Sequence, residues 1–96
     1  MSTLLEEIHA LIDAPNVERS HVERTLTDGY AHALNLEVQG MRLQKRVDAL
    51  TQDLHGDDVR ESAKELRVLA KELDGNSGDL STLRAVLAQL RSRIRT

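Results

Sequence analysis

The sequence lacks cysteine, phenylalanine and tryptophan, and its 96 residues include one tyrosine, one proline and five glycines. Without cysteine the chain has no disulfide framework, no thiolate metal ligand and no cysteine nucleophile. With one aromatic residue, the core must consist of Leu, Val, Ile and Ala side chains, which suit helix packing better than an aromatic-rich sheet. The composition therefore predicts a mainly helical protein.

Long apolar runs are also missing, since no stretch of 18 apolar residues occurs, and the first 13 residues hold Glu6 and Glu7 but no Lys or Arg. These absences argue against a membrane span and a signal peptide, so we expect a cytoplasmic protein with no membrane partner. The net charge of −3 is unevenly spread. Residues 1–30 contain six acids and two arginines, whereas residues 80–96 contain four arginines and no acid.

One long helix organises the chain. Small or apolar residues recur there at alternating steps of four and three, at Val22, Leu26, Gly29, Ala33, Leu36, Gly40, Leu43, Val47, Leu50 and Leu54. This spacing keeps one helix face dry along its whole length and predicts a helix over residues 16–55, about 60 Å long. Gly56 follows as its terminating residue.

Shorter helices are predicted on either side of this long helix. A Thr3/Glu6 capping box starts a helix over residues 3–13, which Pro15 ends, so that it folds back as far as about Leu26. Asp58 starts a helix over residues 58–74, and Leu-rich periodicity gives another over residues 79–95, with a Gly- and Asp-rich loop between them. Residues 1–96 thus form one all-α domain of four helices: a long central helix, a short N-terminal helix and a C-terminal antiparallel helical hairpin.

The middle of the long helix lacks a predicted partner within the chain. By length, the helix over residues 58–74 reaches back only to about Val38, while the first helix stops near Leu26. Two glycines lie in or near this interval, although each costs a helix about 1 kcal/mol, and close approach of a second helix would explain them. We therefore predict a homodimer in which two copies of the long helix cross. The predicted interface comprises Gly29, Tyr30, Ala33, Leu34, Leu36, Gly40 and Met41. The alternative is a compact monomer whose long helix breaks at Asp28 and Gly29.

The segment TLTDGYAHALNLE, residues 25–37, resembles a segment of short bacterial helical proteins of unassigned function, which share the pattern TLTDGYA-x-AL-x-LE. The resemblance covers little beyond the long helix. It implies a helical fold and brings no activity, so no functional residue follows from it.

Several carboxylate and imidazole pairs are candidates for chemistry. Two Glu-x-x-His pairs match the ligand spacing of di-iron helical bundles, and an Asp and a His one turn apart could begin acid–base chemistry. On a helical wheel the first pair points away from its apolar stripe, and exposed helix pairs are the favoured interpretation. The groups are Glu6, His9, Glu18, His21, Asp28 and His32. No nucleophile motif or phosphate loop accompanies them, so we predict no enzyme, no metal and no cofactor.

Basic residues form stripes on the last two predicted helices and would share one face of an antiparallel hairpin. They are Arg60, Lys64, Arg67, Lys71, Arg84, Arg91 and Arg95. Three roles are open for this basic face. It is an ordinary solvated surface, a binding site for an acidic protein (residues 1–30 of another copy among the candidates), or a phosphate-binding site. We favour a homodimeric adaptor or interaction module, and keep a nucleic-acid-associated regulator as the lower-ranked alternative.

Overall fold

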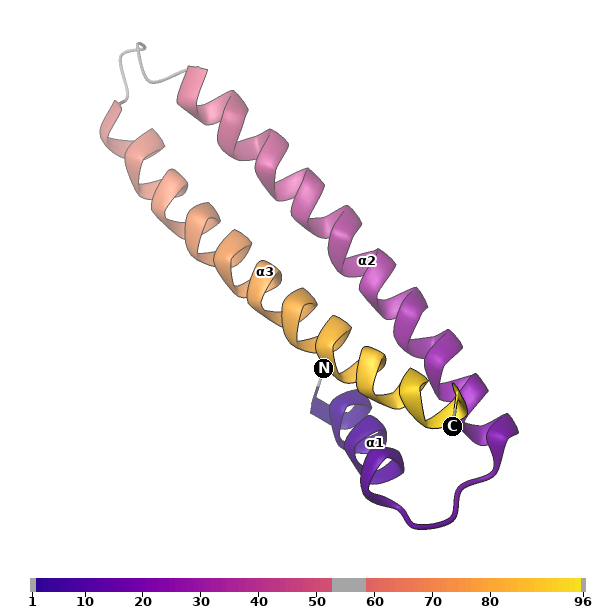
Figure 1. The fold of residues 1–96 in the computed structure, drawn as a ribbon. Helices are drawn as coiled ribbons and strands as arrows, with labels where there is room; N and C mark the ends of the chain where they lie inside the picture. The colour runs from indigo at the N-terminus through magenta and orange to yellow at the C-terminus, as the bar shows by residue number, and fades with distance from the viewer. Residues whose placement is uncertain (1, 53–58, 96) are drawn as a thin grey trace.

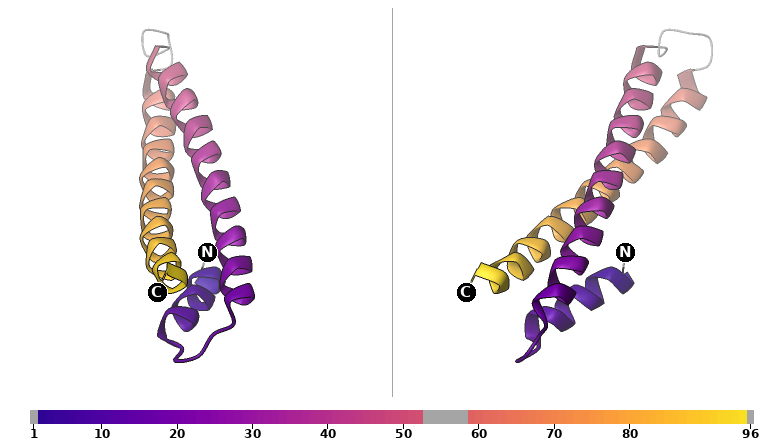
Figure 2. Two further views of the ribbon diagram at one scale, coloured as in Figure 1. Left: turned by 45° about the vertical axis from the view of Figure 1, so that its right-hand side comes forward. Right: turned by 90° about the vertical axis from the view of Figure 1, so that its right-hand side faces the viewer.

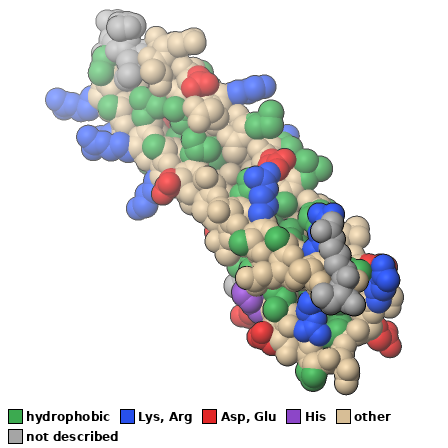
Figure 3. Space-filling model, in the orientation of Figure 1, with side chains coloured by type: hydrophobic (Ala, Val, Ile, Leu, Met, Phe, Trp, Pro, Cys, Tyr) green, Lys and Arg blue, Asp and Glu red, His purple; other side chains and the backbone are tan. Residues whose placement is uncertain are grey.

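Two long antiparallel helices form a hairpin, and a short helix packs at one end of it (Figure 1). The computed structural model describes residues 2–52 and 59–95. In these ranges the elements are α1 (Ser2–Asp13), α2 (Arg19–Gln52) and α3 (Val59–Arg95). The molecule is a rod of 62 × 16 × 16 Å, an outline that Figure 3 also shows. The prediction of an all-α chain is confirmed, whereas the prediction of four helices is wrong.

The missing fourth helix results from α3, which continues through residues 74–79, where a loop was expected. Gly75 and Gly78 lie within this continuous helix: neither has a positive φ, and a Cβ built at either would meet nothing within 4 Å. The inward side of α3 keeps alternating steps of four and three through this segment. The residues on this spacing are all buried or half-buried: Leu66, Leu69, Leu73, Asn76, Leu80, Leu83, Leu87, Leu90 and Ile94. Asn76 is the polar residue among these otherwise apolar positions.

The register between α2 and α3 is set by two glycines of α2. A Cβ built on Gly29 would lie 2.4 Å from Leu87 Cδ2, and one built on Gly40 would lie 2.8 Å from Asn76 Oδ1. In both pairs the residue numbers add up to 116, so one antiparallel register extends from one pair to the other. Because α3 is a single helix, it covers the interval of α2 that was predicted to have no partner within the chain.

Helix α2 is continuous through Asp28 and Gly29, as predicted for the long helix, and the alternative break at these residues is wrong. It starts at Arg19, three residues after the predicted start at residue 16. The carbonyl oxygen of Glu18 accepts hydrogen bonds from the backbone N–H groups of His21 (3.1 Å) and Val22 (3.2 Å). The predicted terminator Gly56 and cap Asp58 lie outside the described residues.

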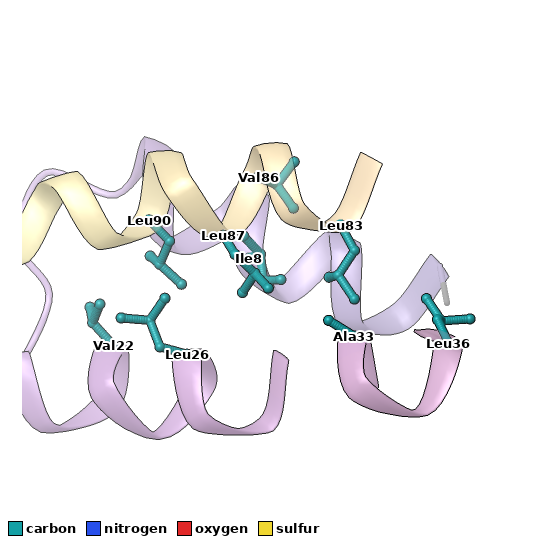
Figure 4. Close-up of a cluster of buried hydrophobic side chains, with 9 residues drawn as sticks. All are labelled: Ile8, Val22, Leu26, Ala33, Leu36, Leu83, Val86, Leu87 and Leu90. Atoms are coloured by element: carbon teal, nitrogen blue, oxygen red, sulfur yellow. The ribbon is translucent and has the colours of Figure 1, made fainter. Parts of the chain in front are cut away.

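The hydrophobic core sits at the end of the rod where α1 joins the hairpin (Figure 2). It contains Ile8, Val22, Leu26, Ala33, Leu36, Leu83, Val86, Leu87 and Leu90. In Figure 4 the side chains of Leu26 and Leu90 point toward one another from facing helices, and Ile8 of α1 belongs to the same cluster. The side chain of Arg93 donates a hydrogen bond to the carbonyl oxygen of Ile12, which satisfies an acceptor in the last turn of α1. Through these contacts α1 packs against both α2 and α3.

The opposite half of the rod contains only α2 and α3 in the described ranges and is less deeply buried. Leu43, Val47 and Leu50 of α2 are half-buried, and Leu69 is the buried residue that α3 contributes between Val59 and Leu80. Arg46 and Glu65 pair across this half at 2.9 Å. The apolar contact between α2 and α3 therefore extends along the described part of the hairpin, but α1 adds to the core at one end only.

Candidate interaction surface

An apolar stripe remains exposed on the outer side of α2. Its members, named here the outer stripe, are Tyr30, Leu34, Val38 and Met41. Their exposed fractions are 46%, 60%, 38% and 63%, values typical of surface side chains although all four are large and apolar. At about 100° per residue they fall within about 80° of one another around the helix. Hydrophobic side chains reach the surface along the α2 side of the rod in Figure 3.

The predicted dimer interface divides between two faces of α2. Tyr30, Leu34 and Met41 belong to the outer stripe and are exposed. The other members lie against α3: Gly29, Ala33 and Leu36 are buried, and half-buried Gly40 faces Asn76. The prediction that Gly29, Ala33 and Leu36 lack a partner within the chain is wrong, because the uninterrupted α3 packs against them and supplies the close helix that Gly29 and Gly40 require.

Val38 was absent from the predicted interface, although it lies four residues after Leu34 and thus on the same side of the helix. Its omission followed from the expectation that a second helix would reach back to this position. Once α3 is known to pack on the side of α2 that carries Gly29 and Ala33, the residue spacing assigns Val38 to the exposed side, together with Leu34.

One edge of the outer stripe is bordered by charged groups of α3. The guanidinium of Arg84 forms an ion pair with the Glu37 carboxylate, which lies between Leu34 and Met41 along α2. Beside it, a shallow groove of about 330 Å³ is lined by Tyr30, Leu87, Ala88 and Arg91 among others. Both partners of the ion pair are well exposed, so this edge is polar and the pair contributes little to stability.

The predicted basic face also divides in two. Arg60, Lys64, Arg67 and Lys71 are exposed on the outer side of α3, and Figure 3 shows basic side chains projecting from that side of the rod. Arg84 and Arg91 instead lie on the flank next to α2. The expected common face depended on an antiparallel pair of helices, but within a single helix Lys71 and Arg84 point about 140° apart. Arg95 ends α3, and its side chain lies outside the described part.

The carboxylate and imidazole groups singled out in the sequence lie mostly on the surface, and Asp28 is exposed. Glu6, His9, Glu18 and His21 are exposed, and no group of three or more His, Asp or Glu side chains in the described ranges could hold a metal ion. His32 is half-buried, and its Nε2 atom is buried without a hydrogen-bond partner among the described residues.

Comparison with known proteins gives no indication of function. No protein-family model matches this chain, and no curated protein or solved structure is detectably similar to it. Among the helices of the described residues, none combines the length and the apolar character needed to cross a membrane. The outer stripe is the feature that helix packing within the chain does not explain.

Proposed function

We propose that this protein is a non-enzymatic helical interaction module that forms a homodimer through the outer stripe of α2. The observation that carries the proposal is the exposure of four large apolar side chains on one side of α2, after α1 and α3 have covered the other side. Leaving such side chains in water forgoes about 1.5–3 kcal/mol for each one that could be fully buried. Aligned exposed apolar residues commonly mark a protein contact.

The residue types of the outer stripe suit a protein interface. Tyr and Met are enriched in interface cores, and a tyrosine offers a rigid apolar ring with a polar tip. Arg84 and Glu37 give the stripe a polar border, as expected of an interface rim. A rod of this length could also present its remaining surfaces to further proteins, which is the sense in which we propose an adaptor.

Sedimentation equilibrium of the native chain and of Leu34→Glu tests the dimer. Leu34 is 60% exposed, so a glutamate there should leave the monomer folded while it places a charge in the proposed contact. Val68→Glu is the matched control, because Val68 is a comparably exposed apolar residue (57%) on α3, outside the outer stripe. Ala33, a member of the interface predicted from the sequence, is unsuitable for such a charge because it is buried against α3.

The proposal expects a native dimer, a folded Leu34→Glu monomer and a Val68→Glu dimer, with helicity checked by circular dichroism. A native chain that sediments as a monomer at all accessible concentrations would reject the homodimer. So would a Leu34→Glu variant that dimerises as tightly as the native chain.

The alternative function, nucleic-acid association, would use the four exposed cations on the outer side of α3. Arg60, Lys64, Arg67 and Lys71 follow one another over about 16 Å of helix, a spacing that could contact several phosphates. Binding to a duplex DNA of mixed sequence would then weaken steeply with salt, whereas a contact through the outer stripe would not. We rank this function second because the chain has a net charge of −3 and no aromatic residue lies among these cations.

A further inference from the structure

Charged residues flank the outer stripe at both ends in a complementary order. Continuing along the same side of α2, Arg19 and Glu23 precede Tyr30, and Lys45 and Asp48 follow Met41. All four charged side chains are exposed. Glu37 also lies on this side, within the stripe, and pairs with Arg84 of its own chain. Apart from Glu37, the order of charge from N-terminus to C-terminus is positive, negative, apolar, positive, negative.

This order distinguishes between the two directions in which a second copy could bind. In a parallel dimer in register, each charged residue would face its own counterpart, which places Glu23 against Glu23 and Lys45 against Lys45. Like charges directly opposite one another destabilise a helix pair. In an antiparallel dimer the negative residue at one end can face the positive residue at the other.

We propose that two copies of the chain pair antiparallel along α2, with the two-fold axis passing beside Leu34. This inference rests on the proposed homodimer and adds its direction and register. Positions whose numbers add up to 68 then face each other across the axis. Glu23 faces Lys45 of the second copy, and Arg19 lies beside the second copy's Asp48, and both pairs occur twice.

The same register covers every member of the outer stripe. Leu34 packs against Leu34 of the second copy, and Tyr30 packs against its Val38. Met41 faces the methyl group of the second copy's Thr27, which is exposed in the monomer. Each apolar side chain of the stripe thus meets an apolar group, while the charged pairs close both ends of the contact.

A neighbouring antiparallel register pairs Tyr30 with Met41 but places Leu34 against Glu37 of the second copy, and it is also disfavoured by charge. If the axis passed between residues 35 and 36, Tyr30 would face Met41 of the second copy. Glu23 would then face Asp48 of the second copy, a repulsive pair. Charge therefore selects the register centred on Leu34.

Helix α3 does not obstruct this arrangement. The face of α2 that carries Gly29, Ala33 and Gly40 lies about 115° around the helix from the outer stripe. A second copy of α2 on the stripe would leave the contacts of α3 intact. The contact is isologous, so both copies offer the same surface and the pair closes without forming a filament.

Charge reversal at Glu23 separates the three arrangements in one measurement of the dimer dissociation constant. In the register centred on Leu34, Glu23→Lys turns two attractive pairs into repulsive ones and raises the dissociation constant about tenfold at low salt. In a parallel dimer the variant leaves it unchanged, since one like-charge pair replaces another. In the neighbouring antiparallel register the variant tightens the dimer, because the introduced ammonium group would face Asp48 of the second copy.

The second variant, Glu23→Lys combined with Lys45→Glu, should restore native affinity, because both pairs are attractive again with reversed signs. Lys64→Glu is the control, since it makes the same charge change as Lys45→Glu on the outer side of α3 and should leave the dissociation constant unchanged. A dimer that Leu34→Glu disrupts but Glu23→Lys does not weaken would overturn the proposed register and keep the homodimer. A native chain without any dimer would reject both proposals.

Cysteine cross-linking gives an independent readout, because the native chain contains no cysteine. An oxidised mixture of Thr27→Cys and Met41→Cys chains should form the mixed disulfide. Thr27→Cys alone should not, because its two copies would lie about 21 Å apart along the antiparallel pair. Efficient cross-linking of Thr27→Cys with itself, without the mixed product, would overturn the proposed direction.

Discussion

The side-chain amide of Asn76 in α3 donates a hydrogen bond to the backbone carbonyl oxygen of Leu36 in α2, with 3.0 Å between Nδ2 and the oxygen. The other polar atom of the amide, Oδ1, lies where a Cβ on Gly40 would be only 2.8 Å away. A polar residue in an otherwise apolar helix seam commonly fixes register, because sliding the helices would leave it without its partner. Gly40 provides the space that this hydrogen bond requires.

Gly40 and Asn76 should therefore be energetically coupled. In the native background, Gly40→Ala should lower the free energy of unfolding by about 1 kcal/mol, because the new methyl group displaces the amide of Asn76. In an Asn76→Ala background the same substitution should raise it by about 0.5–1 kcal/mol, because only the better helix propensity of Ala remains. Urea unfolding of the four variants measures this cycle, and an effect of equal sign and size in both backgrounds would contradict it.

The two glycines in the middle of α3 should behave differently. Gly75→Ala and Gly78→Ala should each raise the free energy of unfolding by about 0.5–1 kcal/mol, because both residues are helical and exposed and have open space at the Cβ position. Thermal or urea unfolding provides the measurement. Destabilisation by both substitutions would mean that residues 74–79 are not helical in solution.

Gly29 is the contrasting case within α2. A Cβ at this position would lie 2.4 Å from Leu87 Cδ2, and Leu87 is only 1% exposed, so its side chain has little room to move. Gly29→Ala should therefore lower the free energy of unfolding by about 1–3 kcal/mol in spite of its gain in helix propensity. If this variant unfolds at a higher urea concentration than the native chain, the close packing of α2 on α3 at this position is incorrect.

Ile8 should stabilise the packing of α1 on the hairpin, because it is fully buried among core residues of α2 and α3. Ile8→Ala should cost about 2–5 kcal/mol, the range found when a large buried aliphatic side chain is truncated. Hydrogen exchange should show faster exchange throughout α1 in this variant. Leu34→Ala, at an exposed position, is the matched control and should change the stability of the monomer by less than about 1 kcal/mol.

His32 should be replaceable with a gain in stability. Its Nε2 atom is buried and has no hydrogen-bond partner among the described residues. His32→Leu should therefore raise the free energy of unfolding by about 1 kcal/mol at pH 7, because an unsatisfied polar atom no longer has to be removed from water. His9→Leu, at an exposed position of α1, is the control and should have a smaller effect. A loss of stability in His32→Leu would indicate that the imidazole contributes a contact that the apolar side chain cannot replace.

The helical class and the continuity of α2 follow from local features of the chain. Leu, Val, Ile and Ala dominate its apolar residues, and the spacing from Val22 to Leu50 alternates between four and three without an interruption. That periodicity is a local property, so it survives in the structure regardless of which helix packs against it. Tyr30, Leu34 and Met41 could likewise be placed on one side of a helix from spacing alone.

The helical state of residues 74–79, in contrast, depends on packing between distant parts of the chain. Their local chemistry, with two glycines, two aspartates, an asparagine and a serine, favours a loop. Packing overrides this preference because α2 runs alongside residues 74–79, and Asn76 makes its hydrogen bond only when it stays in helical register with the leucines on either side. Tertiary packing commonly outweighs local propensity in this way.

The continuity of α3 also determines which surfaces are available. It buries Gly29 and Ala33, directs Lys71 and Arg84 to different sides of one helix, and leaves the outer stripe exposed. The sequence shows that α2 has apolar residues on two sides, but their spacing is the same whether the partner is another part of the chain or a second copy. The packing of α3 decides which apolar side of α2 is covered, because burial depends on what lies opposite a residue and not on its neighbours in sequence.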